Sequence, residues 1–409
     1  MLKKTLLTLG VGLAIIGSQA AMADSLTQAK RIHDRLTGTP PDAAVLQQMA
    51  DLIDSNPADG DKQAAEIALQ DPDFYNVTLK NFIAPWTNEE QTVFTPLNDY
   101  TATVIGMIRD DIDFREVLSG DIIYTGNVSP AYSTSNNEHY EALEALGPQL
   151  GNLADENILQ QKTQSAVTGL DTNATAGVLT TRAAARAFFI DGTNRAMFRF
   201  TMVNYLCTDL EPLKDNSRIP DHVHQDVSRS PGGDSRIYLN SCVGCHAGMD
   251  GMMGAFSHYN LAYNKDGNGN VIEDTAQLEY TPNDIQAKFL INENNFKPGY
   301  VTTDDSWINY WRNGQNALLG WASPPPPGVS LDAKGHAVGS GAKTLGRELA
   351  NSDAFAQCQV KKAFQAVCLR EPGNTADRDQ VASTVATFKA EGYKMKQVFR
   401  DVAAYCKGN

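Results

Sequence analysis

Five consecutive residues constrain this chain more than any other feature: Cys242-Val243-Gly244-Cys245-His246, a C-x-x-C-H motif. Two thiols three residues apart on one helical turn reach the same edge of a porphyrin, where each forms a thioether. The imidazole that follows them projects onto the iron. The spacing therefore predicts one covalently bound haem c, attached through Cys242 and Cys245, with His246 as the proximal iron ligand.

Two other kinds of site also use closely spaced cysteines. A zinc site needs a second pair of Cys or His ligands, and the only close histidine pair, His222 and His224, lies about twenty residues upstream. A redox-active dithiol usually occurs in a thioredoxin-like βαβ unit, and the sequence shows no such unit. Both alternatives are weaker than the haem interpretation.

The N-terminus has the layout of a secretory signal peptide. Lys3 and Lys4 precede an apolar stretch from Leu6 to Ile16, and a run of small residues ends at Ala23. The apolar stretch is too short to cross a bilayer as a helix. We therefore expect cleavage after Ala23, with a short membrane anchor as the alternative, and no membrane span in the mature chain. The expected location is the periplasm, and full secretion is the alternative.

The charge balance is acidic, with 34 Lys and Arg against 48 Asp and Glu and a formal net charge of −14. Binding to phosphate backbones needs clustered basic residues, so nucleic acid is not an expected partner. An acidic surface suits a redox partner protein with a basic docking face. Hydrophobic residues make up 42% of the 409-residue chain, which is enough to build a folded core.

The remaining cysteines are Cys207, Cys358, Cys368 and Cys406, and an oxidising compartment favours disulfides between them. Cys358 and Cys368 lie on one predicted helix, about 15 Å apart along its axis, which exceeds the ~7 Å that a disulfide spans. Three consecutive antiparallel helices in the tail bring the end of the third beside the end of the first. This favours Cys368–Cys406 and leaves Cys207–Cys358 by elimination, with buried free thiols as the alternative.

Apolar residues recur at helical spacing along most of the chain. We expect helices over residues 42–53, 62–69, 73–82, 101–108, 183–204 (interrupted at Gly192), 354–369, 376–391 and 393–405. Asp353 and Thr375 are the expected N-caps of the first two tail helices. The predicted fold class is mainly α: a multi-helix c-type cytochrome with short β-hairpin insertions.

The predicted domain organisation follows from these elements and from one proline run, Pro324 to Pro327, which is typical of a stiff linker. We expect a signal peptide at 1–23, an N-terminal helical domain at 24–175, a c-type haem-binding domain at 176–322, a Pro/Gly-rich linker at 323–340 and a C-terminal helical domain at 341–409.

One polar segment, Asn264 to Asn270, resembles the start of a calcium-binding loop. However, Thr275 stands where such a loop needs a bidentate glutamate. A β-hairpin turn is the favoured interpretation, and calcium is not an expected cofactor.

The haem needs further contacts beyond the motif. Arg229 and Arg236, shortly before the motif, are candidate propionate ligands because guanidinium groups suit carboxylates; ordinary solvated charges are the alternative. Met249 lies on the same side of a helix as His246 and is a poor distal ligand. The distal ligand stays open among His222, His224, His258, His336, Met252, Met253 and Met395.

Four segments together resemble a large family of single-haem c-type cytochromes first catalogued among planctomycetes. They are Arg35 to Pro41 (RLTGTPP), Gly177 to Thr181 (GVLTT), Cys242 to Asp250 (the C-x-x-C-H-x-x-M-D signature) and Leu349 to Phe355 with the following Cys358. The resemblance implies a haem-bearing electron carrier or oxidoreductase, and it supplies no substrate. The chain differs from the family pattern in having its proline run after the haem motif.

The sequence therefore predicts an exported single-haem c-type cytochrome that acts in electron transfer. The alternative is a haem-dependent oxidoreductase or peroxidase-like enzyme with an open sixth iron position, because one haem needs only a domain of roughly 100 residues and this chain is much longer. A scaffold protein with an ancillary haem is a third interpretation. No acid–base constellation near the motif identifies catalytic residues.

Overall fold

A computed structural model describes residues 24–147, 153–190, 192–223, 235–272, 275–290 and 300–408 of the chain. The predicted signal peptide at 1–23 lies outside these residues, as do two of the predicted haem contacts, His224 and Arg229.

The described chain is mainly helical, as the sequence predicts, with a few short sheets. The helices are α1 (Ser25–Thr37), α2 (Ala43–Ser55), α3 (Gly60–Ala68), α4 (Lys80–Ile83), α5 (Asp99–Arg109), α6 (Glu138–Ala145), α8 (Gln164–Thr168), α9 (Arg182–Phe188), α10 (Arg195–Leu206), α11 (Ser235–Ile237), α12 (Val243–Met253), α14 (Gly341–Ala350), α15 (Asp353–Cys368), α16 (Thr375–Ala390) and α17 (Met395–Tyr405). Two π-helical turns, Phe74–Leu79 and Tyr238–Cys242, precede α4 and α12.

The expected helices are present, and local hydrogen bonds explain where two of them begin. The predicted N-caps of α15 and α16 are each wrong by one residue. Ser352 caps α15, because its hydroxyl accepts a hydrogen bond from the Phe355 amide at 3.2 Å. Asn374 caps α16 in a reciprocal capping box with Asp377, in which each side chain accepts from the other residue's backbone amide.

The named strands of the described residues pair antiparallel. The strands are β1 (Ile123–Gly126), β2 (Leu159–Lys162), β3 (Tyr259–Ala262), β4 (Gln277–Tyr280), β5 (Ser306–Asn309), β6 (Ser330–Leu331) and β7 (Ala337–Ser340). β3 pairs with β4. Between them, an antiparallel bridge joins Lys265 to Val271, which agrees with the hairpin turn predicted at Asn264 to Asn270. Between them, the Asp266 carboxylate accepts bonds from the Asn268 and Asn270 amides, and the chain turns there.

The predicted linker at 323–340 does not act as a simple spacer. Its second half supplies β6 and β7, and β7 lies between β6 and β5 in a three-stranded sheet. The proline run indicates a stiff, extended first half of the segment, but it carries no information about the long-range strand pairing of the second half. Residues 330–340 are therefore part of the folded structure.

One continuous cluster of buried apolar residues extends from Ala29 to Cys406 and draws on all three predicted helical domains. The chain's end returns to its beginning: α17 packs against α1 and α3, and the Arg31 and Arg35 guanidinium groups donate to the carbonyls of Lys407 and Cys406. The predicted domains therefore share a core.

Both predicted disulfides are present. Cys207 at the end of α10 bonds to Cys358 on α15, with Cα atoms 5.2 Å apart. Cys368 at the end of α15 bonds to Cys406 after α17, with Cα atoms 5.5 Å apart. The second bond joins the ends of the first and third tail helices, as the antiparallel arrangement requires.

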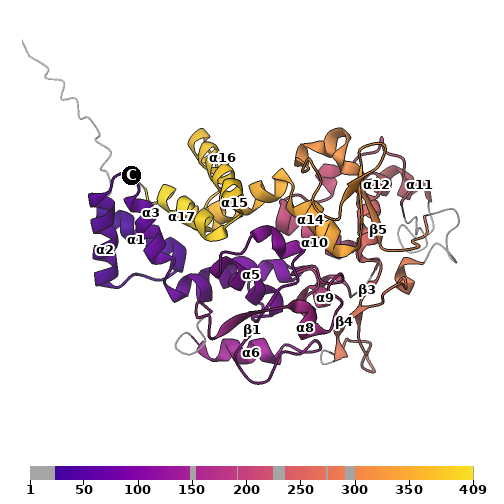
Figure 1. The fold of residues 1–409 in the computed structure, drawn as a ribbon, viewed down its shortest axis with the longest axis horizontal. Helices are drawn as coiled ribbons and strands as arrows, with labels where there is room; N and C mark the ends of the chain where they lie inside the picture. Colours follow the sequence, from indigo (N-terminus) through magenta and orange to yellow (C-terminus); the bar gives the residue numbers. More distant parts are fainter. Residues whose placement is uncertain are drawn as a thin grey trace, which may run out of the picture.

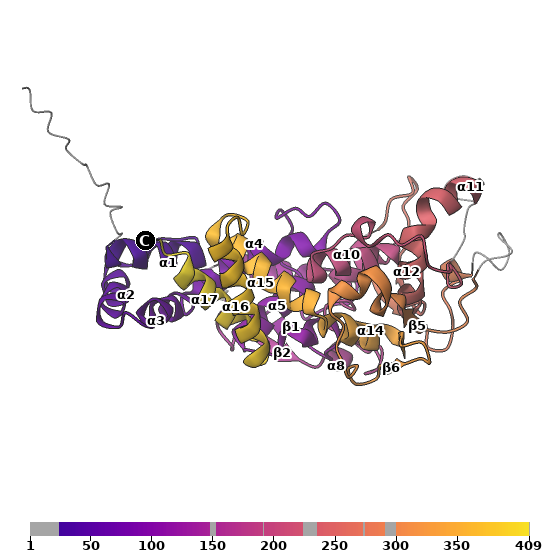
Figure 2. The ribbon, with the colours of Figure 1, turned by 90° about the horizontal axis from the view of Figure 1, so that it is seen from above.

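The molecule is elongated (Figures 1 and 2). In both views α1, α2, α3 and α17 lie at one end, whereas α11, α12 and β5 lie at the other. Within the described residues, no helix combines the length and apolar character needed to cross a bilayer.

We predict that the double substitution Cys368→Ser/Cys406→Ser lowers the free energy of unfolding by about 4 kcal/mol, because the bond closes a loop with a sequence separation of 38. Urea unfolding followed by far-ultraviolet circular dichroism measures this. The double substitution Cys207→Ser/Cys358→Ser opens a longer loop, with a separation of 151. It should lower the free energy of unfolding by about 1 kcal/mol more than the first variant does. An unchanged midpoint in either variant would contradict the expectation.

Candidate functional site

The C-x-x-C-H motif forms the start of α12. Cys242 is both the last residue of the π-helical turn and the N-cap residue of α12, and Cys245 and His246 lie in the first turns of that helix. Cys242 and Cys245 are half-buried, and they are the two cysteines that remain outside disulfides. Irregular helical turns of this kind are frequent at functional sites.

The His246 imidazole is held on one side by a buried carboxylate. Its Nδ1 lies 3.0 and 3.1 Å from the two carboxylate oxygens of Asp250, one helical turn further on. The Asp250 side chain is completely buried, and its charge is balanced by Arg195 from α10, whose Nη2 lies 3.1 Å from Oδ2. This assigns the proton of a neutral His246 to Nδ1 and leaves the Nε2 lone pair available to a metal.

A buried phenol lies beside the same imidazole. The rings of Tyr238 and His246 have centroids 5.5 Å apart. The Tyr238 hydroxyl is buried and has no hydrogen-bond partner among the described residues. Burial, together with the nearby Asp250 charge, raises the pKa of Tyr238, so the phenol stays protonated and leaves a hydrogen-bond donor unsatisfied next to His246.

Glycines on the opposite face of α12 determine how the helix lies. A Cβ atom at Gly248 would come within 1.9 Å of Nε1 of Trp311, and one at Gly251 within 3.0 Å of the Ile308 carbonyl oxygen. Gly248 is two residues from His246 and therefore about 160° away around the helix. Because only glycine permits this contact with β5 and the turn that follows it, His246 faces away from that sheet.

The Cys245 thiol lacks the electrostatics of a reactive cysteine. Burial raises the pKa of the Cys245 thiol, whereas a nucleophilic cysteine needs a lowered pKa. The Cys245 sulfur lies 3.7 Å from the Leu210 carbonyl oxygen, in hydrogen-bonding contact. The site therefore holds a protonated thiol.

Two distal-ligand candidates meet at one tyrosine. The Tyr310 ring centroid lies 5.6 Å from that of His222 and 4.9 Å from that of His336. The Tyr310 hydroxyl is 2.8 Å from His222 Nδ1, and its ring lies against Gly251. Gly251 is five residues, and about 140° around the helix, from His246. These two histidines therefore gather on the glycine side of α12.

The other candidates are scattered. Met252 and Met253 are fully buried within α12 itself. His258 follows the helix, with Nδ1 3.8 Å from Asp305. Met395 lies in α17, at the opposite end of the molecule from α12 (Figures 1 and 2), so the fold does not bring it to the motif and it is withdrawn as a candidate.

Of the two candidate propionate ligands, only Arg236 is described. It lies on α11 and is exposed to solvent, and its carbonyl accepts a hydrogen bond from Asn240. The arginines of α10 have other roles, because Arg195 pairs with Asp250 and Arg199 pairs with Asp209.

Sequence reasoning missed the role of Asp250 as the partner of His246. The available signal was its spacing: an acidic residue four positions after a histidine in a helix lies on the same face.

Among the described residues, no group of three or more His, Cys, Asp and Glu side chains is arranged to hold a metal ion. Comparisons of the chain with models of protein families, with curated proteins and with solved structures give no match. The chemistry of the site must therefore be argued from its own residues.

We predict that Gly248→Ala lowers the free energy of unfolding by about 2 kcal/mol, because the new methyl group overlaps the Trp311 indole in a packed interior. A destabilising effect would point to this overlap, because in a helix interior alanine is otherwise more stable than glycine by about 1 kcal/mol. Urea unfolding measures the difference. Gly267→Ala, where a Cβ meets open space, is the control and should stay within about 0.5 kcal/mol of the parent.

Proposed function

We propose that this chain is an exported single-haem c-type cytochrome that acts in electron transfer. The observation that carries the proposal is the state of three side chains at the start of α12. Cys242 and Cys245 stay unpaired while the other four cysteines form disulfides, and His246 has its Nδ1 engaged by Asp250. Two free thiols and an available imidazole nitrogen are the donor set that thioether attachment and axial ligation require.

The residues around the C-x-x-C-H motif also fit a haem. Val223, Tyr238 and Ala247 form a small buried apolar cluster against which Cys242 packs, and an apolar environment of this kind suits a porphyrin. The unsatisfied Tyr238 hydroxyl offers a hydrogen-bond donor there. When bound, the haem supplies an iron that takes up and releases one electron. An acidic surface then favours a partner protein with a basic docking face.

The protein's own contribution is to hold the axial imidazole. Asp250 accepts the Nδ1 proton of His246, fixes the ring orientation and makes Nε2 a stronger donor. Arg195 balances the Asp250 charge through an ion pair in which Nη2 lies 3.1 Å from Oδ2. The tautomer and the orientation of His246 thus depend on a contact between α10 and α12.

A haem-dependent oxidoreductase is the second candidate, and the same Asp250 contact favours it. A carboxylate partner makes the axial imidazole more basic, and this stabilises the oxidised iron relative to the reduced iron. Absorption spectra of the reduced protein separate the two functions. A spectrum that shifts with carbon monoxide supports an open sixth position and an enzyme, whereas an unchanged spectrum supports the carrier.

We expect the purified mature protein, expressed with haem-ligation machinery, to be coloured and to carry the mass of one porphyrin. Cys242→Ser and Cys245→Ser should each remove one thioether and reduce the yield of bound pigment, because one sulfur then holds the porphyrin alone. Intact-protein mass spectrometry and the pyridine spectrum measure this. The control, Cys368→Ser/Cys406→Ser, removes two cysteines away from the motif and should keep the pigment. A colourless parent protein would refute the proposal.

We expect Asp250→Asn to raise the midpoint potential by on the order of tens of millivolts, because it removes a buried negative charge near the iron ligand. Asp209→Asn is the matched control, since Asp209 also pairs with an arginine of α10 but at an exposed site, where screening makes a charge weak. Equal potentials in the parent and in Asp250→Asn would show that Asp250 does not tune the iron.

A further inference from the structure

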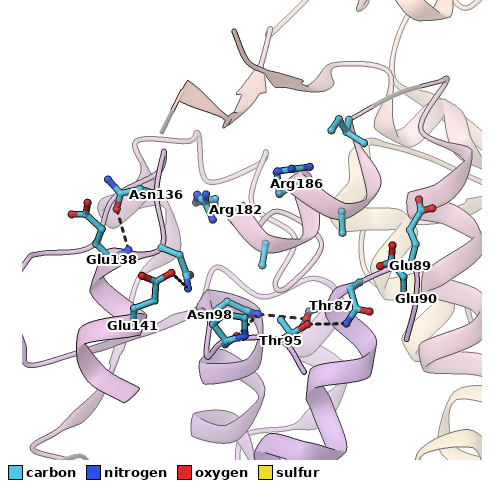
Figure 3. Close-up of a pocket in the computed structure, with 16 residues that line it drawn as sticks. Thr87, Glu89, Glu90, Thr95, Asn98, Asn136, Glu138, Glu141, Arg182 and Arg186 are labelled. Carbon is cyan, nitrogen blue, oxygen red and sulfur yellow. Dashed lines mark hydrogen bonds between the residues drawn. The ribbon is translucent and has the colours of Figure 1, made fainter. Parts of the chain in front are cut away.

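A separate cavity lies away from the motif, between α6, α9 and the segment that precedes α5 (Figure 3). Its volume is about 950 Å³, at the upper end of the range for small-molecule sites. Apart from alanine, proline and isoleucine side chains, its lining consists of threonines, asparagines, glutamates and two arginines. None of the described lining residues is aromatic, so the cavity offers no stacking platform for a sugar ring or a nucleobase.

Two guanidinium groups occupy the middle of this cavity. Arg182 and Arg186 lie one helical turn apart on α9 and project from the same face (Figure 3). The Arg182 Nε is buried and has no hydrogen-bond partner among the described residues. The rest of the Arg182 side chain is half-buried at the wall of the cavity, and a carboxylate is the acceptor whose planar geometry matches a guanidinium group.

Asp99 positions Arg182 without binding its guanidinium group. The buried Asp99 carboxylate accepts hydrogen bonds from the backbone amides of Arg182 and Ala183, at 2.6 and 3.0 Å. It therefore fixes the first turn of α9. Both carboxylate oxygens of Asp99 are thus engaged by backbone amides, while the Arg182 side chain lines the cavity.

Glutamates flank the arginines on both sides. Glu138 and Glu141 of α6 lie on one side, and Glu89 and Glu90 lie on the other (Figure 3). These four carboxylates repel anions such as phosphates and attract a cationic group. A ligand that pairs with the central arginines and with the flanking glutamates needs both a carboxylate and an ammonium group in one small molecule.

We propose that this cavity binds a short peptide with free termini, with its C-terminal carboxylate on Arg182 and Arg186 and its ammonium group on the flanking glutamates. The volume exceeds the need of a single amino acid, the lining supplies polar groups for a peptide backbone, and the small apolar side chains Ala183 and Ala187 suit small peptide side chains. This site is independent of the haem motif, and its test needs no haem signal.

Isothermal titration calorimetry of the full mature protein tests the proposal, with trialanine as the probe. Trialanine should bind, while trialanine amide, which lacks the carboxylate, and N-acetyl-trialanine, which lacks the ammonium group, should each bind about tenfold or more weakly. Inorganic phosphate should bind more weakly than trialanine. The absence of trialanine binding, or tighter binding of phosphate, would overturn the proposal.

Substitutions in the cavity lining test whether trialanine binds there. Arg182→Gln and Arg186→Gln should each weaken trialanine binding about tenfold or more. Glu138→Gln/Glu141→Gln should weaken trialanine but leave N-acetyl-trialanine unchanged. The control is Arg378→Gln, which alters an exposed arginine on α16. Thermal unfolding of each free variant checks its folding. Binding that is equal in the parent and in folded arginine variants would reject this cavity as the site.

Discussion

The contact between the buried Asp250 carboxylate and Arg195 is the interaction on which the candidate site depends. It holds His246 in one tautomer, and it joins α12 to α10. α10 is fixed in turn at its other end by the Cys207–Cys358 disulfide to α15. An uncompensated buried carboxylate is strongly unfavourable, so the orientation of the imidazole is coupled to the packing of the C-terminal helices.

The elements that the sequence predicts correctly are those set by local patterns. Helical periodicity identifies the helices. Helix length excludes a Cys358–Cys368 bond, and the antiparallel arrangement of the three tail helices then favours the two disulfides that are present. Cap positions differ by one residue because Ser352 and Asn374 compete with neighbours that are equally good formers of N-caps. Such competition is decided by backbone geometry, which periodicity does not report.

Long-range contacts account for what the sequence does not predict. β6 has two residues and β7 four, and neither has a pattern that distinguishes it from a linker next to a proline run. The clustering of His222 and His336 at Tyr310 likewise needs a long-range contact, because Tyr310 lies 88 positions after His222 in the chain. The candidate motif itself is visible in the sequence, because thioether chemistry needs its residues at fixed spacing. The Asp250 and Arg195 contacts that orient it are not.

Four arginines on α9 and α10 show why side-chain type alone does not assign function. In the sequence, four arginines of the same charge lie in one short stretch: Arg182, Arg186, Arg195 and Arg199. In the fold, Arg195 compensates a buried carboxylate and Arg199 forms an exposed pair, while Arg182 and Arg186 line a cavity. The break between the two helices, near Gly192 with its φ of +65°, separates these roles. Because α9 and α10 also pack against each other, a ligand on α9 and the imidazole held through α10 share one structural support.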